Sequence, residues 1–203
     1  MPASPTVTPR KQPRQARAAA TMAAVVEAAA RILEAEGLGG FNTNAVAARA
    51  GVAIGSLYQY FPGKDAIMAA LIRREAEAFD AALAEAVAAT RELGAASAVA
   101  LLARTVVAHQ SARPRLARLL DLEEHRLGLA REAEASGART GGVIARFLAE
   151  RRLGSGEAAW DILHLSRGLI DGALERGALD GLDRRLTWAI LGYLALSREA
   201  SAA

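Results

Sequence analysis

The chain has 203 residues, of which 52% are hydrophobic and 4% aromatic, and it contains no cysteine. This length is sufficient for one large or two small domains whose core needs neither disulfides nor a metal. The lack of cysteine excludes disulfide frameworks, thiolate nucleophiles, iron–sulfur clusters and cysteine-based zinc sites, and it agrees with a reducing cytoplasm. Because aromatic residues are few, the core must consist mainly of Ala, Leu, Val and Ile, and the strong helix formers among them favour an all-α fold.

The formal net charge of +3 is unevenly distributed. Residues 1–64 contain seven basic and three acidic residues, a net charge of +4, whereas the remainder contains 18 basic and 19 acidic residues, a net charge of −1. This asymmetry indicates that the N-terminal part contacts a polyanion. No apolar run reaches the roughly 20 residues of a membrane-spanning helix. The sequence therefore predicts a cytoplasmic protein with no membrane partner.

The N-terminal segment, residues 1–20, combines four prolines with small and basic residues and is predicted to be a disordered basic arm. Its role is open, because such arms serve equally as solubilising tails and as minor-groove contacts. Apolar residues then recur at helical spacing from Thr21, the predicted N-cap of the first helix, to Gly37, its predicted end.

Two short predicted helices follow. The first runs from an N-cap at Asn42 or Thr43 to a turn at Gly51, and the second covers about residues 54–60. A long helix is then predicted to start at Asp65. Two short helices that are joined by a glycine-containing turn and packed on a preceding helix are typical of a helix-turn-helix, whose second helix enters the DNA major groove.

Five more helices are predicted from apolar spacing and from breaks at glycine and proline. They cover residues 95–112, 114–127, about 132–153, 156–179 and 182–198. The predicted domains are the arm at residues 1–20, a helix-turn-helix domain at residues 21–66 and a helical bundle at residues 67–203.

Residues 42–65 carry a specific motif. They read NTNAVAARAGVAIGSLYQYFPGKD, with an Ala-Gly-Val turn, a glycine and a small hydroxyl residue, Leu-Tyr, Tyr-Phe, and a lysine before an acid. This stretch resembles the TetR family of bacterial transcriptional regulators. With the first helix, the resemblance covers Thr21 to about Leu71, and the later helices agree with the family in number and length only. The resemblance implies a three-helix DNA-binding domain followed by a helical bundle for ligand binding and dimerisation.

The resemblance also implies DNA contacts at nine positions. Phosphate anchors would be Thr43 and Asn44, with Asn44 nearer to a base. The positions that read bases in the family are Ile54, Gly55, Ser56 and Gln59. The positions that hold the DNA backbone are Tyr58, Tyr60 and Lys64.

Two residues depart from the family pattern. Ala53 stands where a serine cap is usual, and the loss of such a cap costs a helix about 0.5–2 kcal/mol. Ile54 stands where a polar or basic residue is common. Because an isoleucine side chain cannot hydrogen-bond a base but can pack on a thymine methyl group, we expect a thymine at a contacted position of the operator.

For the bundle, the resemblance implies an inducer pocket and a homodimer formed by the last two long helices. The candidate pocket residues are bulky or polar aromatic residues: Phe79, His109, Phe147, Trp160 and His164. The candidate dimer residues are two glycines that allow close helix approach and four bulky residues: Gly168, Gly172, Trp188, Leu191, Tyr193 and Leu196. A palindromic operator has two half-sites, each of which binds one helix-turn-helix, and this favours a dimer.

The sequence thus predicts a ligand-responsive transcriptional regulator and not an enzyme. It would be a repressor that binds a palindromic double-stranded DNA operator as a homodimer, associates with the nucleoid when bound, and is released by an unidentified small molecule. The alternative is a helical ligand-binding or catalytic protein whose DNA module is inactive. Two groups of residues are candidates for acid–base or metal chemistry: Asp161 with His164, and Glu123 to His125. A metal or acid–base site in a helical bundle needs a second, matching set of residues on a facing helix, and the sequence shows none. No cofactor or metal is expected.

Overall fold

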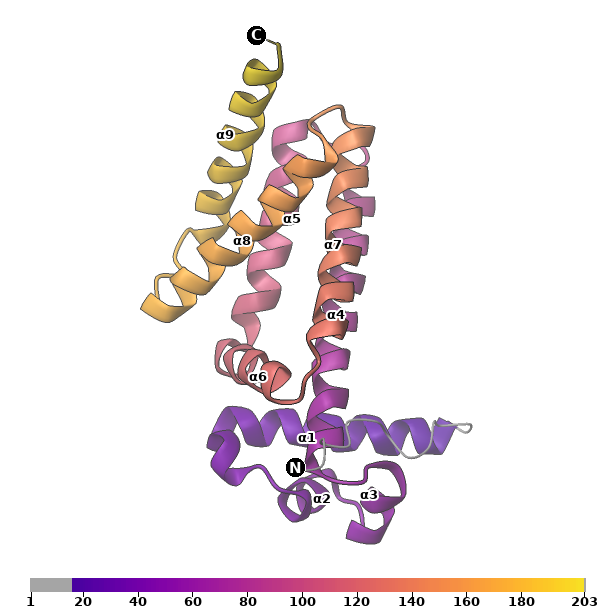
Figure 1. Ribbon diagram of the computed structural model, residues 1–203. Coiled ribbons are helices and arrows are strands. Elements are labelled where there is room, and N and C mark those ends of the chain that lie inside the picture. The colour runs from indigo at the N-terminus through magenta and orange to yellow at the C-terminus, as the bar shows by residue number, and fades with distance from the viewer. Residues whose placement is uncertain (1–15, 203) are drawn as a thin grey trace. The chain divides into compact units, whose positions relative to one another are not determined.

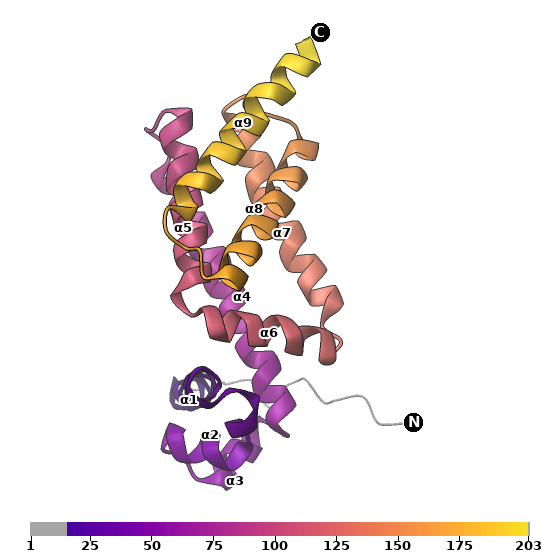
Figure 2. The same cartoon turned by 90° about the vertical axis from the view of Figure 1, so that its left-hand side faces the viewer.

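The computed structural model describes residues 16–202, with side chains up to residue 197. This part of the chain forms helices and contains no strand (Figures 1 and 2). The predicted all-α fold is therefore confirmed. Residues 1–15, most of the predicted basic arm, lie outside the described residues. None of the helices in the described range combines the length and the apolar character needed to cross a bilayer.

The helices are α1 (Ala16–Gly40), α2 (Thr43–Ala50), α3 (Ile54–Tyr60), α4 (Lys64–Ala89), α5 (Ala95–Ala112), α6 (Pro114–Arg126), α7 (Ala130–Glu150), α8 (Gly156–Arg176) and α9 (Leu182–Ala202). They divide into two compact units. Unit 1 comprises the chain up to Glu77 together with Arg115–Ala133, and unit 2 comprises Ala78–Pro114 and the chain from Glu134 onwards. Both α4 and α7 contribute residues to each unit.

Helix α1 begins earlier than the sequence pattern predicted. Residues 16–20, expected to belong to the disordered arm, are helical, and the alanines among them favour continuation of the helix. Thr21 is therefore not an N-cap: it lies inside α1, and its hydroxyl donates to the carbonyl of Arg17 at 2.9 Å. Gly37, the predicted end, instead forms a kink with a φ of 68°, and the helical turn continues to Gly40.

The core of unit 1 is built from aliphatic side chains of α1, α2, α3, α6 and the start of α4. Ile32, Leu33, Leu57 and Leu116 are among its largest fully buried side chains. Burial of each contributes about 1.5–3 kcal/mol relative to exposure. The presence of Leu116 in this core makes α6 part of the same compact unit as the helix-turn-helix, whereas the sequence pattern assigned it to the bundle.

Ion pairs connect α6 and α7 to α4 within unit 1. Arg126 donates to Asp65 at the start of α4, at 2.5 Å, and to Glu123 in its own helix, at 2.8 Å. These hydrogen bonds to the carboxylates, the one to Glu123 having the largest effect and the one to Asp65 the next, raise the pKa of Arg126 above its ordinary value. Arg73 forms two hydrogen bonds with Glu132, at 2.7 and 2.8 Å. The first turns of α4 are thus fixed by charged as well as apolar contacts.

Unit 2 is a bundle of α5, α8, α9 and the remaining parts of α4 and α7. Helix α5 contacts both α8 and α9. The fully buried side chains Leu148, Leu182 and Leu186 belong to a second apolar core, separate from that of unit 1. Arg151, the residue that follows α7, donates to the carbonyls of Thr90 and Leu93 and so secures the turn between α4 and α5.

Candidate DNA-binding interface and ligand cavity

The turn between α2 and α3 is fixed by backbone geometry. Asn42 is the N-cap of α2, because its Oδ1 accepts from the N–H of Ala45 at 2.9 Å. At the other end, Gly51 adopts the left-handed conformation with a φ of 68°, which a glycine takes without strain. The N–H of Val52 then donates to the carbonyl of Ala47 at 3.0 Å. This turn sets the direction in which α3 begins.

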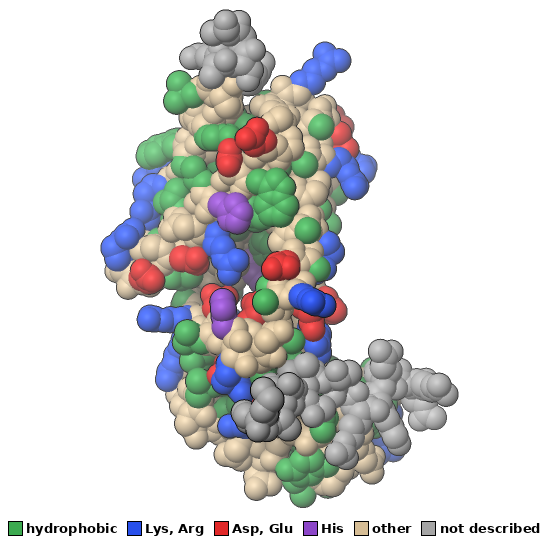
Figure 3. Space-filling model, viewed as in Figure 1, with side chains coloured by type: hydrophobic (Ala, Val, Ile, Leu, Met, Phe, Trp, Pro, Cys, Tyr) green, Lys and Arg blue, Asp and Glu red, His purple; other side chains and the backbone are tan. Residues whose placement is uncertain are grey.

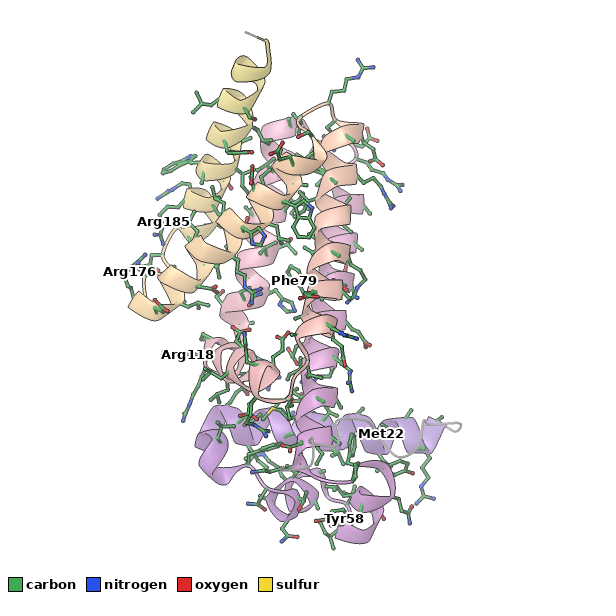
Figure 4. The ribbon with its side chains drawn as sticks, viewed as in Figure 1. Met22, Tyr58, Phe79, Arg118, Arg176 and Arg185 are labelled. Atoms are coloured by element: carbon green, nitrogen blue, oxygen red, sulfur yellow. The ribbon has the colours of Figure 1, made fainter. Side chains whose placement is uncertain are left out.

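Helix α3 has one buried side and one exposed side. Leu57 and the following Phe61 are fully buried, so they anchor the helix to the core of unit 1. Ala53 precedes the helix without a side-chain cap, as the sequence indicated. The side chains of Ile54 and Tyr58 are each 39% exposed. Figure 4 labels Tyr58 on this helix.

The nine residues predicted to contact DNA are all accessible to some degree. Asn44, Ile54, Gly55, Tyr58, Gln59 and Lys64 are exposed, and Thr43, Ser56 and Tyr60 are half-buried. They supply hydroxyl, amide and ammonium groups, which bond phosphates and base edges. They lie in α2, in α3 and at the start of α4, and each is at least partly accessible to a partner.

One hydrogen bond joins two of these side chains directly. The hydroxyl oxygens of Thr43 and Tyr58 lie 3.1 Å apart, and either of them can donate. Thr43 is the first residue of α2 and Tyr58 is in α3, so the bond connects the two helices of the motif at their exposed side.

A comparison with protein families matches residues 25–71 to the model of bacterial regulatory proteins of the tetR family. Residues 25–71 are therefore similar to the DNA-binding domain of the TetR family. The match includes α2, α3 and the Thr43–Tyr58 pair, and it confirms the resemblance carried by the sequence motif. A comparison with curated proteins finds no match.

Several solved structures share the fold over most of the chain. A protein of Mesorhizobium loti named for the TetR family of transcriptional regulators has a TM-score of 0.74 at 20% identity, covering 90% of this chain and 98% of its own. The fatty acid degradation regulator FadR of Bacillus halodurans has a TM-score of 0.67 at 18% identity, covering 90% and 97%. The multidrug binding protein EbrR, complexed with imidazole, has a TM-score of 0.62 at 22% identity, covering 82% and 92%. At these identities the likeness establishes the fold alone.

Unit 2 contains an apolar cavity of about 80 Å³. It is lined by side chains of α4, α5, α7, α8 and α9, and two of the predicted pocket residues, Phe79 and Phe147, are among them. Figure 4 labels Phe79 on α4. Thr140 and Ser166 also line the cavity, although the sequence interpretation missed them. The sequence signal that could have identified these two residues is a hydroxyl residue at helical spacing among apolar residues.

The three other predicted pocket residues do not line the cavity. The ring of His109 packs edge-on against that of Phe79, with ring centroids 5.2 Å apart. Trp160 is 47% exposed and stacks on His164, which is exposed as well. These two residues occupy one face of α8, four positions apart, whereas the cavity is lined from another face by Ile162 and Ser166. Trp160 and His164 are therefore surface residues in this chain.

The predicted dimer residues fall into two groups. Trp188 and Leu196 of α9 are 62% and 67% exposed, and Figure 3 shows apolar side chains on the surface near α8 and α9. Leu191 and Tyr193 are half-buried and pack on the core of unit 2. Neither Gly168 nor Gly172 approaches another helix within the described chain: a Cβ added at Gly168 would meet open space, and one at Gly172 would meet only Arg176.

The carboxylate of Asp161, considered from sequence as a catalytic or metal-binding group, has a structural partner. It accepts a hydrogen bond from the hydroxyl of Tyr193, which raises the pKa of Tyr193 above its ordinary value. Among the described residues, no group of three or more His, Asp or Glu side chains is arranged to hold a metal ion.

Proposed function

We propose that this protein is a ligand-responsive repressor that binds a palindromic DNA operator as a homodimer. The observation that supports the proposal is the Thr43–Tyr58 hydrogen bond, which connects α2 and α3, the two helices that hold eight of the nine accessible residues. In a helix-turn-helix, the second helix enters the major groove and its N-terminal residues contact base edges. The proposed site of action is the cytoplasm, on the nucleoid when DNA is bound.

Each exposed group has a chemical role in this proposal. The amide of Gln59 and the hydroxyl of Ser56 bond base edges, where they distinguish sequences. Lys64 and the hydroxyls of Thr43 and Tyr58 bond phosphates, where they provide affinity and fix the register without reading sequence.

The homodimer is proposed to form through α8 and α9. The exposure of Trp188 and Leu196 on the same helix supports it, because large exposed apolar side chains are typical of interaction surfaces. Gly168 supports it too, since the space beside it is open to a helix of a second copy, whereas at Gly172 the flexible side chain of Arg176 would have to move. A two-fold dimer would place two α3 helices in successive major grooves, about 34 Å apart.

The inducer is proposed to enter the cavity of unit 2. Helix α4 supplies Phe79, Leu83 and Val87 to its wall, and the same helix begins at Lys64 beside the helix-turn-helix. A ligand that displaces the cavity wall would therefore move a continuous helix whose first turn belongs to the DNA-binding unit. Such a ligand changes operator affinity only if it binds the two states of α4 with different affinity.

The test is selection of bound fragments from the source genome at fixed moderate salt, followed by sequencing. An enriched palindrome with two half-sites about one helical turn apart is the expected result. Binding to that operator must then weaken steeply with salt, because phosphate contacts release counterions. A ligand-free protein that enriches no sequence would favour the alternative, a helical ligand-binding or catalytic protein with an inactive DNA module.

A further inference from the structure

The cavity of unit 2 has a distinctive chemical lining. Fifteen of its 17 lining residues are apolar, the two others are Thr140 and Ser166, and no charged side chain is among them. Transfer of an ionised group into such surroundings without a counter-charge is strongly unfavourable. The lining therefore selects against carboxylates, phosphates and ammonium groups.

Two hydroxyl residues, Thr140 and Ser166, line the cavity, and Thr140 is the more deeply buried of the two. Thr105 and Ser111 of α5 each donate to a backbone carbonyl four residues earlier, at 3.0 and 2.7 Å. Thr140 is only 6% exposed, yet its hydroxyl makes no hydrogen bond with any described residue. Because this hydroxyl lies on the wall of an otherwise apolar cavity, it is available to pair with a hydrogen-bonding group of a molecule inside the cavity.

The size of the cavity limits the ligand. Its volume of about 80 Å³ is roughly half of the ~150 Å³ cavity that holds a benzene molecule. It also lies below the ~300–1,000 Å³ of sites for drug-sized ligands. A small molecule fits without rearrangement, whereas a larger one must move the side chains that line the wall.

We propose that this cavity binds a small, uncharged, mostly hydrocarbon molecule whose one hydrogen-bonding group, an alcohol or its equivalent, pairs with Thr140. The proposal rests on the proposed function in so far as the cavity is the inducer site. Thr140 is the residue that distinguishes an alcohol from a hydrocarbon of the same length.

The experiment uses three four-carbon probes with the full-length protein: 1-butanol, 1-chlorobutane and butyrate, measured by ligand-observed NMR titration at pH 7. We expect 1-butanol to bind and butyrate to bind at least tenfold more weakly. The Thr140→Val variant keeps the shape of the side chain and is expected to bind 1-butanol about fivefold more weakly, with 1-chlorobutane unchanged, as the loss of one neutral hydrogen bond predicts. The matched control is Thr105→Val, which removes a half-buried hydroxyl that does not line the cavity and is expected to change neither affinity.

The outcomes separate this proposal from the proposed function. No binding of 1-butanol, or equal binding of butyrate, overturns the ligand class, and both results come from the unmodified protein. Wild-type affinity of Thr140→Val for 1-butanol overturns the role of Thr140. Operator release is measured separately: if 1-butanol binds as expected but leaves operator affinity unchanged, the ligand class stands and the regulatory function of the cavity fails.

Discussion

The hydroxyl of Thr43 and the hydroxyl of Tyr58 lie 3.1 Å apart, across the two helices of the helix-turn-helix. The core below them is apolar and fixes the helix axes through Leu57 and Phe61, but it does not fix the exposed phenol ring of Tyr58. The bond to Thr43 restricts this ring before DNA arrives. A side chain that is already ordered loses less conformational entropy on binding.

This arrangement predicts that Thr43 and Tyr58 act as a pair in operator binding. Each of the single changes Thr43→Val and Tyr58→Phe is expected to weaken binding about fivefold, equally for operator and unrelated DNA, because a hydrogen bond is worth about 1 kcal/mol and phosphate contacts carry no sequence information. The double variant is expected to lose less than the product of the two single effects, since both changes remove the same bond. Fluorescence anisotropy measures the DNA affinities of the wild type, the two single variants and the double variant, which form a double-mutant cycle. If the loss in the double variant equals the product of the two single losses, the two residues do not act as a pair.

Lys64 is predicted to bind a phosphate. Its side chain is exposed at the first position of α4, so its replacement leaves the core intact. In a homodimer, Lys64→Gln removes one phosphate-binding cation from each copy, and it is expected to reduce the slope of log affinity against log salt by about 2. The matched control is Gln59→Ala, which removes an uncharged exposed group and is expected to change the preferred sequence but not the salt slope. An unchanged slope for Lys64→Gln would exclude the phosphate interaction.

The helix-turn-helix was predictable from sequence to within a residue, because its signals are local. Gly51 is needed for a left-handed turn, and Leu57 and Phe61 recur at the spacing of one buried helix face. The start of α1 was not predicted, because a run of alanines has no amphipathic pattern that marks where a helix begins. In the structure, the helix includes residues 16–20. Thr21 fits a cap by composition but bonds back to Arg17.

The bundle was predictable as a set of helices but not as a site. Phe79 and Phe147 were chosen for bulk and line the cavity, while Trp160 was chosen on the same ground and lies on the surface. Which face of α8 is turned inward depends on tertiary contacts such as those with α5, a helix that is distant in sequence. For the same reason the sequence did not indicate that α6 packs with the DNA-binding unit, where its residue Leu116 is buried.

The apolar surface of α9 is predicted to stabilise the dimer. Leu196→Glu places a charge at a side chain that is 67% exposed in one copy, so it should leave the fold intact and disrupt contact with a second copy. Leu122→Glu is the matched control, because Leu122 of α6 is 60% exposed and lies outside the proposed interface. Sedimentation velocity is expected to show monomer for the first variant and dimer for the second, with equal helicity by circular dichroism. Dimeric Leu196→Glu would place the interface elsewhere.

The Arg73–Glu132 pair predicts an acid-sensitive contribution to stability. The hydrogen bond from Arg73 lowers the pKa of Glu132 below its ordinary value, so the contribution is present above the unfolded-state pKa of about 4.5 and is lost as the pH falls through the lower folded-state pKa. Both side chains are partly exposed, which limits the effect of Glu132→Gln at pH 7 to about 0.2–1 kcal/mol of unfolding free energy.

Urea unfolding of both proteins between pH 7 and pH 3 measures this contribution. The two proteins should become equally stable towards the acid end of the range. Glu134→Gln is the control, because Glu134 lies two residues along α7 and makes no ion pair with any described residue. A difference between wild type and Glu132→Gln that stays constant with pH would show that the pair does not act through its charge.

Ile54 is predicted to read the methyl group of a thymine. It is the first residue of α3, its side chain is 39% exposed, and the neighbouring Gly55 leaves open space beside it. Removal of one methyl group, by deoxyuridine in place of thymidine at the contacted position, is expected to weaken binding about fourfold per half-site, in line with about 0.8 kcal/mol for a buried methylene-sized group. Base pairing is unchanged by this replacement, so the difference reports the methyl contact alone.

The replacement of thymidine by deoxyuridine is also tested with the Ile54→Ala variant, to show that the methyl group is contacted by Ile54 itself. The variant is expected to bind thymidine and deoxyuridine operators equally, because the side chain that covers the methyl group is gone, and Ile54→Lys is expected to select a different sequence. Deoxyuridine at thymines outside the half-sites provides the control and should leave the affinity of the wild-type protein unchanged. If the wild-type protein tolerates deoxyuridine at every operator position, or if Ile54→Lys retains the original operator preference, Ile54 does not read a thymine and the specificity of α3 must come from Ser56 and Gln59.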